Sequence, residues 1–97
     1  MTAFVIVHAR IKDAEKFKEY GATSRPTVAA FGGEFVFRGK FAQALHGVHD
    51  YHLSGVLKFP DQETVTTWYN SDAYQALIPN RDEAADTIFI SCDQAPE

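Results

Sequence analysis

The first strand-like run of this chain most strongly limits the folds that it can adopt. Residues 3–9 (AFVIVHA) are apolar at odd and even positions alike, with His8 as the exception, and their centre is rich in β-branched residues. Side chains of a strand alternate between the two faces of a sheet, so apolar residues at both parities predict a strand covered on both faces. The fold therefore needs a layer on each side of this strand.

The next segment predicts a long amphipathic helix. Asp13 is a suitable N-cap, because its carboxylate can accept hydrogen bonds from the free N–H groups of the first turn. Pro26 falls inside the pattern, and we expect it to break or kink the helix near residues 24–25. Gly32-Gly33 then supplies the C-terminal stop. The helical stripe comprises Ala14, Phe17, Tyr20, Gly21, Ser24, Val28 and Phe31.

Three further strands are predicted from runs rich in apolar and β-branched residues. They cover residues 34–38, 53–59 and 87–92, and a polar loop at 46–52 separates the first two. Gly55 lies inside the middle strand, where a glycine predicts a bulge or a close backbone approach.

Two helical regions lie between the last two strands. Pro60-Asp61 opens the first, and Asn70 ends it. Ser71 caps the next, which Pro79 is expected to stop. One more turn is possible at residues 80–85.

The order of elements is β-α-β-β-α-β, within a single domain over residues 1–97. With right-handed crossovers and a central hairpin, this order gives an α+β, ferredoxin-like sandwich. It has a four-stranded antiparallel sheet with helices on one face, and the first and third strands lie in the middle. In a monomer the other face would be bare, which conflicts with strands that are apolar on both faces. A second copy of the chain is the simplest cover, so we predict a homodimer.

Charge and composition argue against several classes of partner. The net charge is −4, and Lys and Arg do not cluster, whereas nucleic-acid binding needs a basic face. No apolar run approaches the roughly 20 residues of a membrane span. The lone Cys92 excludes an intramolecular disulfide and fits a reducing compartment. We therefore expect a cytoplasmic protein without nucleic-acid or membrane partners.

Two motifs resemble those of a bacterial family called domain of unknown function thirteen-thirty. Residues 32–39 (GGEFVFRG) are similar to its GG-x-(aromatic)-x-x-RG signature. The second half of the family pattern is matched by Phe59-Pro60, residues 68–71 (WYNS), Tyr74-Gln75 and Arg81. The resemblance spans residues 3–92 and implies the dimeric α/β-barrel superfamily, in which two ferredoxin-like sheets close into a barrel. It implies no reaction, because the family is itself uncharacterised.

The chain departs from that family at two places, and the superfamily offers only an analogy of fold. Lys40 follows Gly39 where a second Gly is frequent, and residues 49–52 (HDYH) stand where many members have Pro and Arg. The superfamily includes cofactor-independent monooxygenases, small-ring isomerases and haem-degrading enzymes. The haem-degrading enzymes rely on an Asn on the first strand and a His on the second helix. This chain has His8 on the strand and no His in that helix, so haem is not expected, nor is another cofactor.

His8 and Arg38 are the candidate catalytic residues. An imidazole can act as a general base near neutral pH, and Arg38 ends an apolar strand, where a cation needs a carboxylate partner or a ligand anion. A structural histidine and an ion pair of Arg38 with Glu34 or Asp86 are the alternatives. Because both parities of the first strand are apolar, the pattern is compatible with His8 on either face.

Four rings with polar groups and a second arginine complete the candidate site as ligand-binding residues. The rings can line a pocket for a flat or apolar ligand, and the arginine can hold a carboxylate. These residues are Tyr20, Trp68, Tyr69, Tyr74 and Arg81. Ordinary core and dimer packing is the alternative. His46, His49 and His52 recur at a spacing of three, but without Cys or a helix they do not predict a metal site.

The sequence thus predicts a homodimeric small-molecule-binding protein, and one interpretation is a cofactor-independent enzyme, monooxygenase- or isomerase-like. It would act on a small acidic or aromatic compound, with His8 moving a proton while Arg38 or Arg81 holds an anionic oxygen. A non-catalytic ligand-binding module and a purely structural dimer are the alternatives.

Overall fold

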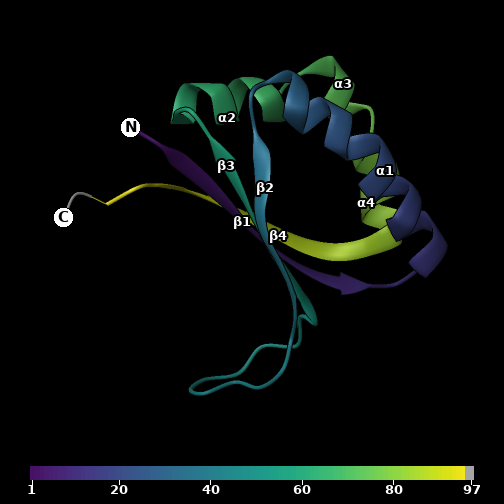
Figure 1. Cartoon of the computed structure of the whole chain (residues 1–97). Coiled ribbons are helices and arrows are strands. Elements are labelled where there is room, and N and C mark those ends of the chain that lie inside the picture. The colour runs from purple at the N-terminus through teal and green to yellow at the C-terminus, as the bar shows by residue number, and fades with distance from the viewer. Residues whose placement is uncertain (96–97) are drawn as a thin grey trace.

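The computed structural model describes residues 1–95 as one antiparallel sheet with helices on one face (Figure 1). The strand order is β2-β3-β1-β4, and every neighbouring pair is antiparallel. The predicted ferredoxin-like arrangement is therefore confirmed, with the first and third strands in the middle. The strands are β1 (Ala3–Ile11), β2 (Glu34–Lys40), β3 (Leu53–Phe59) and β4 (Ala85–Asp93); the helices are α1 (Ala14–Ala30), α2 (Gln62–Tyr69), α3 (Asp72–Gln75) and α4 (Ile78–Ala84). None of these helices has the length and apolar character needed to cross a bilayer.

The two faces of β1 differ in what covers them. Ala3, Val5 and Ala9 are buried on the face that carries the helices. The alternate residues Phe4 and Ile6 are only half-buried. The helices therefore supply one of the two layers that this strand requires.

The sheet face opposite the helices, called here the open face, is apolar across all four strands. Strand register aligns Ile90 with Ile6, Ile6 with Val56, and Val56 with Phe37, which gives a continuous row. The two ends of this row are the most exposed, at 47% for Ile90 and 56% for Phe37. Its apolar residues are Phe4, Ile6, Phe37, Val56, Ile88 and Ile90. The register also places His8, Ser54, Cys92, Lys58 and Glu34 on this face, the last two near one end of it. Exposed apolar patches of this kind mark interaction surfaces.

The core lies between the sheet and the helices and is built around Trp68. Its ring packs on Phe59 and Tyr74, with ring centroids 5.2 Å and 4.5 Å away. The corner between α2 and α3 holds these rings: Asn70 ends α2, and Ser71 caps α3 by accepting a hydrogen bond from the Tyr74 N–H at 3.2 Å. Both boundaries were predicted, because caps depend on a few neighbouring residues.

The helix break expected at Pro26 and the helix end expected at Pro79 were both wrong. Pro26 lies inside α1, which continues to Ala30. Its ring is exposed, and the turn beyond it is anchored by Val28 in the core, so tertiary packing compensates for one missing hydrogen bond. Pro79 stands at the start of α4 instead of ending a helix. A first-turn N–H has no partner within the helix, so proline is tolerated at that position.

The irregularity predicted at Gly55 lies in the neighbouring strand. The register of β2 and β3 shifts between Phe35 and Phe37, while Gly55 itself pairs regularly with Arg38. A Cβ atom on Gly55 would be 3.5 Å from the carbonyl oxygen of Phe37. Of the two predicted features, Gly55 therefore shows the close backbone approach. The bulge lies in β2, between Phe35 and Phe37, and it places both Phe35 and Arg38 on the helix side of the sheet.

The cap of α2 provides a test by pH. The Asp61 carboxylate accepts hydrogen bonds from the Thr64 hydroxyl and N–H, both at 2.7 Å, and these bonds lower its pKa in the folded state. A lowered pKa means that the contribution to stability is present above the unfolded pKa of about 3.9 and is lost as pH falls through the folded value. Asp61→Asn keeps an acceptor without a titrating group. In urea titrations between pH 7 and 2, the wild type should have a higher free energy of unfolding than Asp61→Asn, and this difference should shrink below about pH 4. A difference that does not change with pH would contradict the role of the Asp61 carboxylate as the cap.

Candidate functional site

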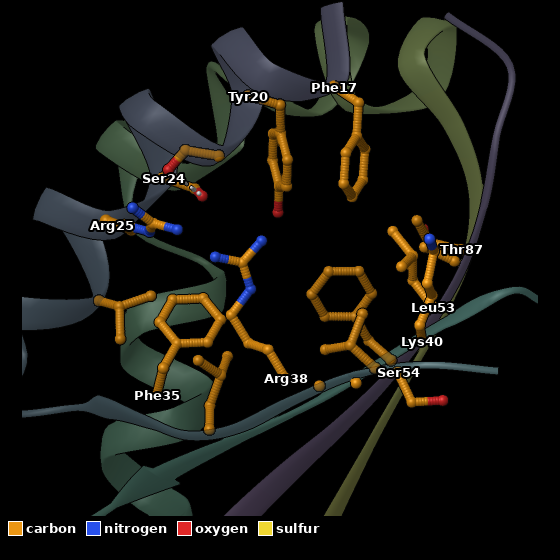
Figure 2. A pocket seen from close by; sticks show the side chains of 18 of the residues that line it. Phe17, Tyr20, Ser24, Arg25, Phe35, Arg38, Lys40, Leu53, Ser54 and Thr87 are labelled. Atoms are coloured by element: carbon orange, nitrogen blue, oxygen red, sulfur yellow. Dashed lines mark hydrogen bonds between the residues drawn. The ribbon is translucent and has the colours of Figure 1, made fainter. Parts of the chain in front are cut away.

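A cavity of about 430 Å³ lies between α1 and the helix side of the sheet (Figure 2). Strands β1 to β4 form its floor, α1 forms its roof, and Trp68 of α2 closes one side. The volume falls in the range of small-molecule sites. Small residues on α1 create the space, because a Cβ atom on Gly21 would meet nothing within 4 Å. Ser24 adds only a hydroxymethyl group to the same wall.

The walls of the cavity are largely apolar and aromatic. Phe17 from α1, Phe35 from β2 and Phe89 from β4 line it, together with Val7 and Leu57 of the central strands. Flat or aliphatic groups lose water-exposed surface when they enter such a space. The cavity therefore suits a ligand with an apolar body.

Three exposed cations border the same cavity, and none of them has a carboxylate partner among residues 1–95. Arg25 of α1 and Arg38 of β2 approach the Phe35 ring, with their guanidinium carbons 5.9 Å and 6.0 Å from its centroid. Lys40 lines the cavity further along β2 (Figure 2). Within residues 1–95, none of the three forms an ion pair with a carboxylate. Their positive charge is thus available to a bound anion.

Neither carboxylate predicted as an alternative partner pairs with Arg38. Asp86 instead accepts a hydrogen bond from Arg10 at 2.9 Å and lies 3.4 Å from Lys12. These contacts lower the pKa of Asp86, mainly through the hydrogen bond from Arg10. Glu34 forms no ion pair within the described chain.

The Tyr20 hydroxyl, which faces the cavity (Figure 2), belongs to a buried polar chain behind it. It lies 2.7 Å from the Tyr74 hydroxyl, which in turn accepts a hydrogen bond from Arg81 Nη1 at 3.2 Å. The same nitrogen donates to the Tyr69 hydroxyl at 3.0 Å. Burial raises the pKa of Tyr20 and Tyr74 above that of an ordinary phenol. Tyr20 therefore stays protonated and acts as a hydrogen-bond donor at neutral pH.

Arg81 keeps its charge within this cluster. Burial by itself lowers its pKa, but the hydrogen bonds to Tyr69 and Tyr74 outweigh that effect and hold the pKa above its ordinary value. Its side chain is 11% exposed and also contacts Asp82 at 3.2 Å. Arg81 is thus tied into the fold and does not line the cavity.

The structure brings together only part of the predicted site. Tyr20, Trp68 and Arg38 line the cavity, whereas Tyr69, Tyr74 and Arg81 lie behind it as the polar chain. Arg25 and the three Phe residues of the wall were not predicted. The α1 stripe carried a usable signal for the cavity, because two of its inward positions are Gly21 and Ser24, which are too small to fill the space.

His8 lies on the open face, on the other side of the sheet from this cavity. Its Nδ1 is 2.8 Å from the Ser54 hydroxyl, and its ring is 5.6 Å from that of His49 and 6.2 Å from that of Tyr51. Within one chain it cannot contact a ligand that Arg38 holds. The structure of the single chain therefore does not bring His8 and Arg38 to one cavity, whereas Tyr20 and Arg38 both line it.

Two of the three loop histidines accept hydrogen bonds from backbone N–H groups. His49 Nδ1 accepts from the Tyr51 N–H at 3.1 Å, and His52 Nε2 accepts from the Ile11 N–H at 2.9 Å. Within the described residues, no group of three or more potential ligands is arranged to hold a metal ion.

The layered fold, with helices on one face of a four-stranded antiparallel sheet, defines a ferredoxin-like α+β domain. The chain belongs to the family described as domain of unknown function (DUF1330), whose profile matches residues 2–93. This confirms the resemblance found in the sequence. No functionally curated protein matches the chain significantly.

Solved structures share this fold at low sequence identity. A protein of unknown function from Rhodopseudomonas palustris is 19% identical, with a TM-score of 0.83 over 99% of this chain and 84% of its own. A dimeric ferredoxin-like protein of unknown function from Jannaschia sp. CCS1 is 10% identical, with a TM-score of 0.77 over 97% and 100%. SnoaB, a cofactor-independent oxygenase from Streptomyces nogalater, is 8% identical, with a TM-score of 0.72 over 99% and 95%.

Proposed function

We propose that this protein is a homodimer that binds a small organic acid in the cavity between α1 and the sheet. The observation that carries the proposal is the set of three cations, Arg25, Arg38 and Lys40, beside an aromatic cavity and without carboxylate partners in residues 1–95. All three side chains are exposed, so they need no partner in the free protein, and a bound carboxylate would pair with them without displacing a carboxylate of residues 1–95. An acid with an apolar body would satisfy both the charge and the walls.

Arg38 is the residue best placed to hold the carboxylate. It projects into the cavity from β2 beside Phe35 (Figure 2), and a guanidinium can bind a carboxylate through two parallel hydrogen bonds. Arg25 approaches from the opposite layer. The apolar body of the acid would then lie among Phe17, Phe89 and Leu57.

Cofactor-independent turnover of the bound acid is the second candidate function. It is favoured by the Tyr20 hydroxyl, a neutral donor that reaches the same cavity and could stabilise an oxygen that becomes negative during reaction. The likeness to the oxygenase from Streptomyces nogalater supports this candidate at the level of fold only.

The homodimer is supported by the open face. Its apolar row from Phe37 to Ile90 crosses the whole sheet and would be buried by the same row of a second copy, as expected for an interface with two-fold symmetry. A solved structure of the same fold is described as dimeric. The cavity opens on the other side of the sheet, so both copies would keep their sites.

The binding proposal is tested by replacing Arg38 with methionine and titrating phenylacetate by calorimetry. Hydrogen bonds to charged groups contribute about 1.5–3 kcal/mol, so we expect affinity to fall roughly ten- to hundredfold. Lys18→Met makes the same change in net charge on the exposed side of α1 and should bind as the wild type does. His8→Ala, on the open face, should also leave affinity unchanged.

Two results would reject acid binding in this cavity. One is an Arg38→Met variant that binds phenylacetate as tightly as the wild type. The other is a wild-type protein whose melting temperature no small carboxylic acid raises, since a ligand at 100 times its Kd should stabilise by about 2.7 kcal/mol. If no acid raises the melting temperature and the protein is still a dimer, a purely structural dimer without a ligand would be favoured.

A further inference from the structure

The direction of the hydrogen bonds between Tyr20 and Tyr74 determines what the cavity can recognise. Tyr74 is fully buried, at 0% exposure, so its hydroxyl proton needs an acceptor within the protein. Its oxygen already accepts from Arg81 Nη1, and the group at 2.7 Å on its other side is the Tyr20 hydroxyl. A phenol carries one donor and can accept at the same time.

If Tyr20 donated to Tyr74, the buried Tyr74 proton would have no acceptor among its hydrogen-bond partners in residues 1–95. A buried donor without a partner destabilises a fold, so the opposite direction is favoured. Arg81 then donates to Tyr74, and Tyr74 donates to Tyr20. The proton of Tyr20 is then not used by Tyr74 and is available to a ligand in the cavity, with the Ser24 hydroxyl on the same wall as its other neighbour.

We propose that the cavity recognises an α-keto acid, with Arg38 holding the carboxylate and the Tyr20 hydroxyl donating to the adjacent carbonyl oxygen. This inference rests on the proposed binding of an organic acid and names its class. Tyr20 and Arg38 project towards one another from the helix layer and the sheet (Figure 2). In this arrangement, a ligand whose carboxylate is bound by Arg38 would present an oxygen on its neighbouring carbon to Tyr20.

Tyr74 and Arg81 are positioning residues in this scheme. They contact Tyr20 and each other but do not line the cavity. Their role is to hold the Tyr20 oxygen as an acceptor, so that the Tyr20 proton is not used by Tyr74 and can be donated to the ligand.

Two acids that differ only at the carbonyl test this inference. Benzoylformate carries the α-carbonyl, and phenylacetate has a methylene group in its place, so their apolar bodies and carboxylates match. We expect wild-type protein to bind benzoylformate about five- to tenfold more tightly in calorimetric titrations, the effect of one additional hydrogen bond. Tyr20→Phe should abolish this preference and leave phenylacetate affinity unchanged.

The positioning role has its own measurement. Hydrogen bonding lowers the stretching frequency of a ketone, so the infrared band of bound benzoylformate should shift down in the wild type and return towards its value in water-free solvent in Tyr20→Phe. Tyr74→Phe should reduce both the shift and the preference. Thr27→Val is the matched control, because it removes the acceptor of the hydrogen bond that Trp68 Nε1 donates to Thr27 Oγ1 (3.1 Å). This hydrogen bond is not part of the chain formed by Tyr20, Tyr74 and Arg81. It should destabilise the protein and keep the shift.

Each outcome separates this inference from the proposal on which it rests. If neither acid binds, the proposed function fails. If both bind equally to the wild type, organic-acid binding stands and the α-keto class is rejected. A preference that survives Tyr20→Phe would reject Tyr20 as the donor, and an unchanged infrared shift in Tyr74→Phe would reject the positioning role.

Discussion

Replacing Ile90 by aspartate is expected to convert the proposed dimer into a monomer of 10.8 kDa. Ile90 lies in β4 at one end of the apolar row across the open face and is 47% exposed in the single chain. In a two-fold interface the substitution places two carboxylates in the contact, and each buried charge costs several kcal/mol. Association should weaken by roughly a thousandfold or more, which sedimentation velocity at micromolar concentration measures.

The matched control is Ala22→Asp, which adds the same charge at an exposed position of α1. It should sediment as the wild type does. A wild-type protein that is monomeric at these concentrations, or an Ile90→Asp variant that remains dimeric, would contradict the interface. Circular dichroism of the monomer should retain the helical signal, because the core between sheet and helices does not include Ile90.

Trp68→Ala is expected to lower the free energy of unfolding by about 3–5 kcal/mol, as large aromatic truncations in cores do. The Trp68 side chain is 1% exposed, packs between Phe59 and Tyr74, and donates from Nε1 to the Thr27 hydroxyl. A chain of this length has a total stability on the order of 5–15 kcal/mol, so the loss is a large fraction of it. Urea denaturation at a fixed protein concentration measures the change.

Trp68→Phe is the comparison that separates ring packing from the hydrogen bond. It keeps an aromatic ring against Phe59 but leaves Thr27 without the indole donor, so the loss should be smaller, about 1–2 kcal/mol. A loss below about 1 kcal/mol in Trp68→Ala would contradict the placement of this ring at the centre of the core.

Features that depend on adjacent residues were predicted well. Asp13, Asp61 and Ser71 cap helices as expected, since a cap is a contact between residues three apart. The two expectations based on Pro26 and Pro79 were wrong for a related reason. A proline rule describes the isolated helix, whereas Pro26 is tolerated because the core anchors the turn that follows it.

The site was predicted only in part, because it is assembled from separate layers. Tyr20 and Arg38 were named from their residue types, yet their position on opposite walls of one cavity follows from the packing of α1 over β2. Arg25 gave no signal, since an exposed arginine on a helix has no distinguishing pattern. Tyr74 has Tyr20 and Arg81 as hydrogen-bond partners, and these residues lie on different helices, so their spacing in the sequence does not indicate the contact.

By itself, the sequence determined the order of the elements and the family, and it predicts a cover on both faces of the sheet, because apolar periodicity and caps are local properties. The tertiary structure decided which face each residue of β1 takes. A strand apolar at both parities has no internal signal for its orientation, so only pairing with β3 and β4 under the helices could place Val5 in the core and His8 on the open face. That orientation moved the candidate chemistry from His8 to Tyr20.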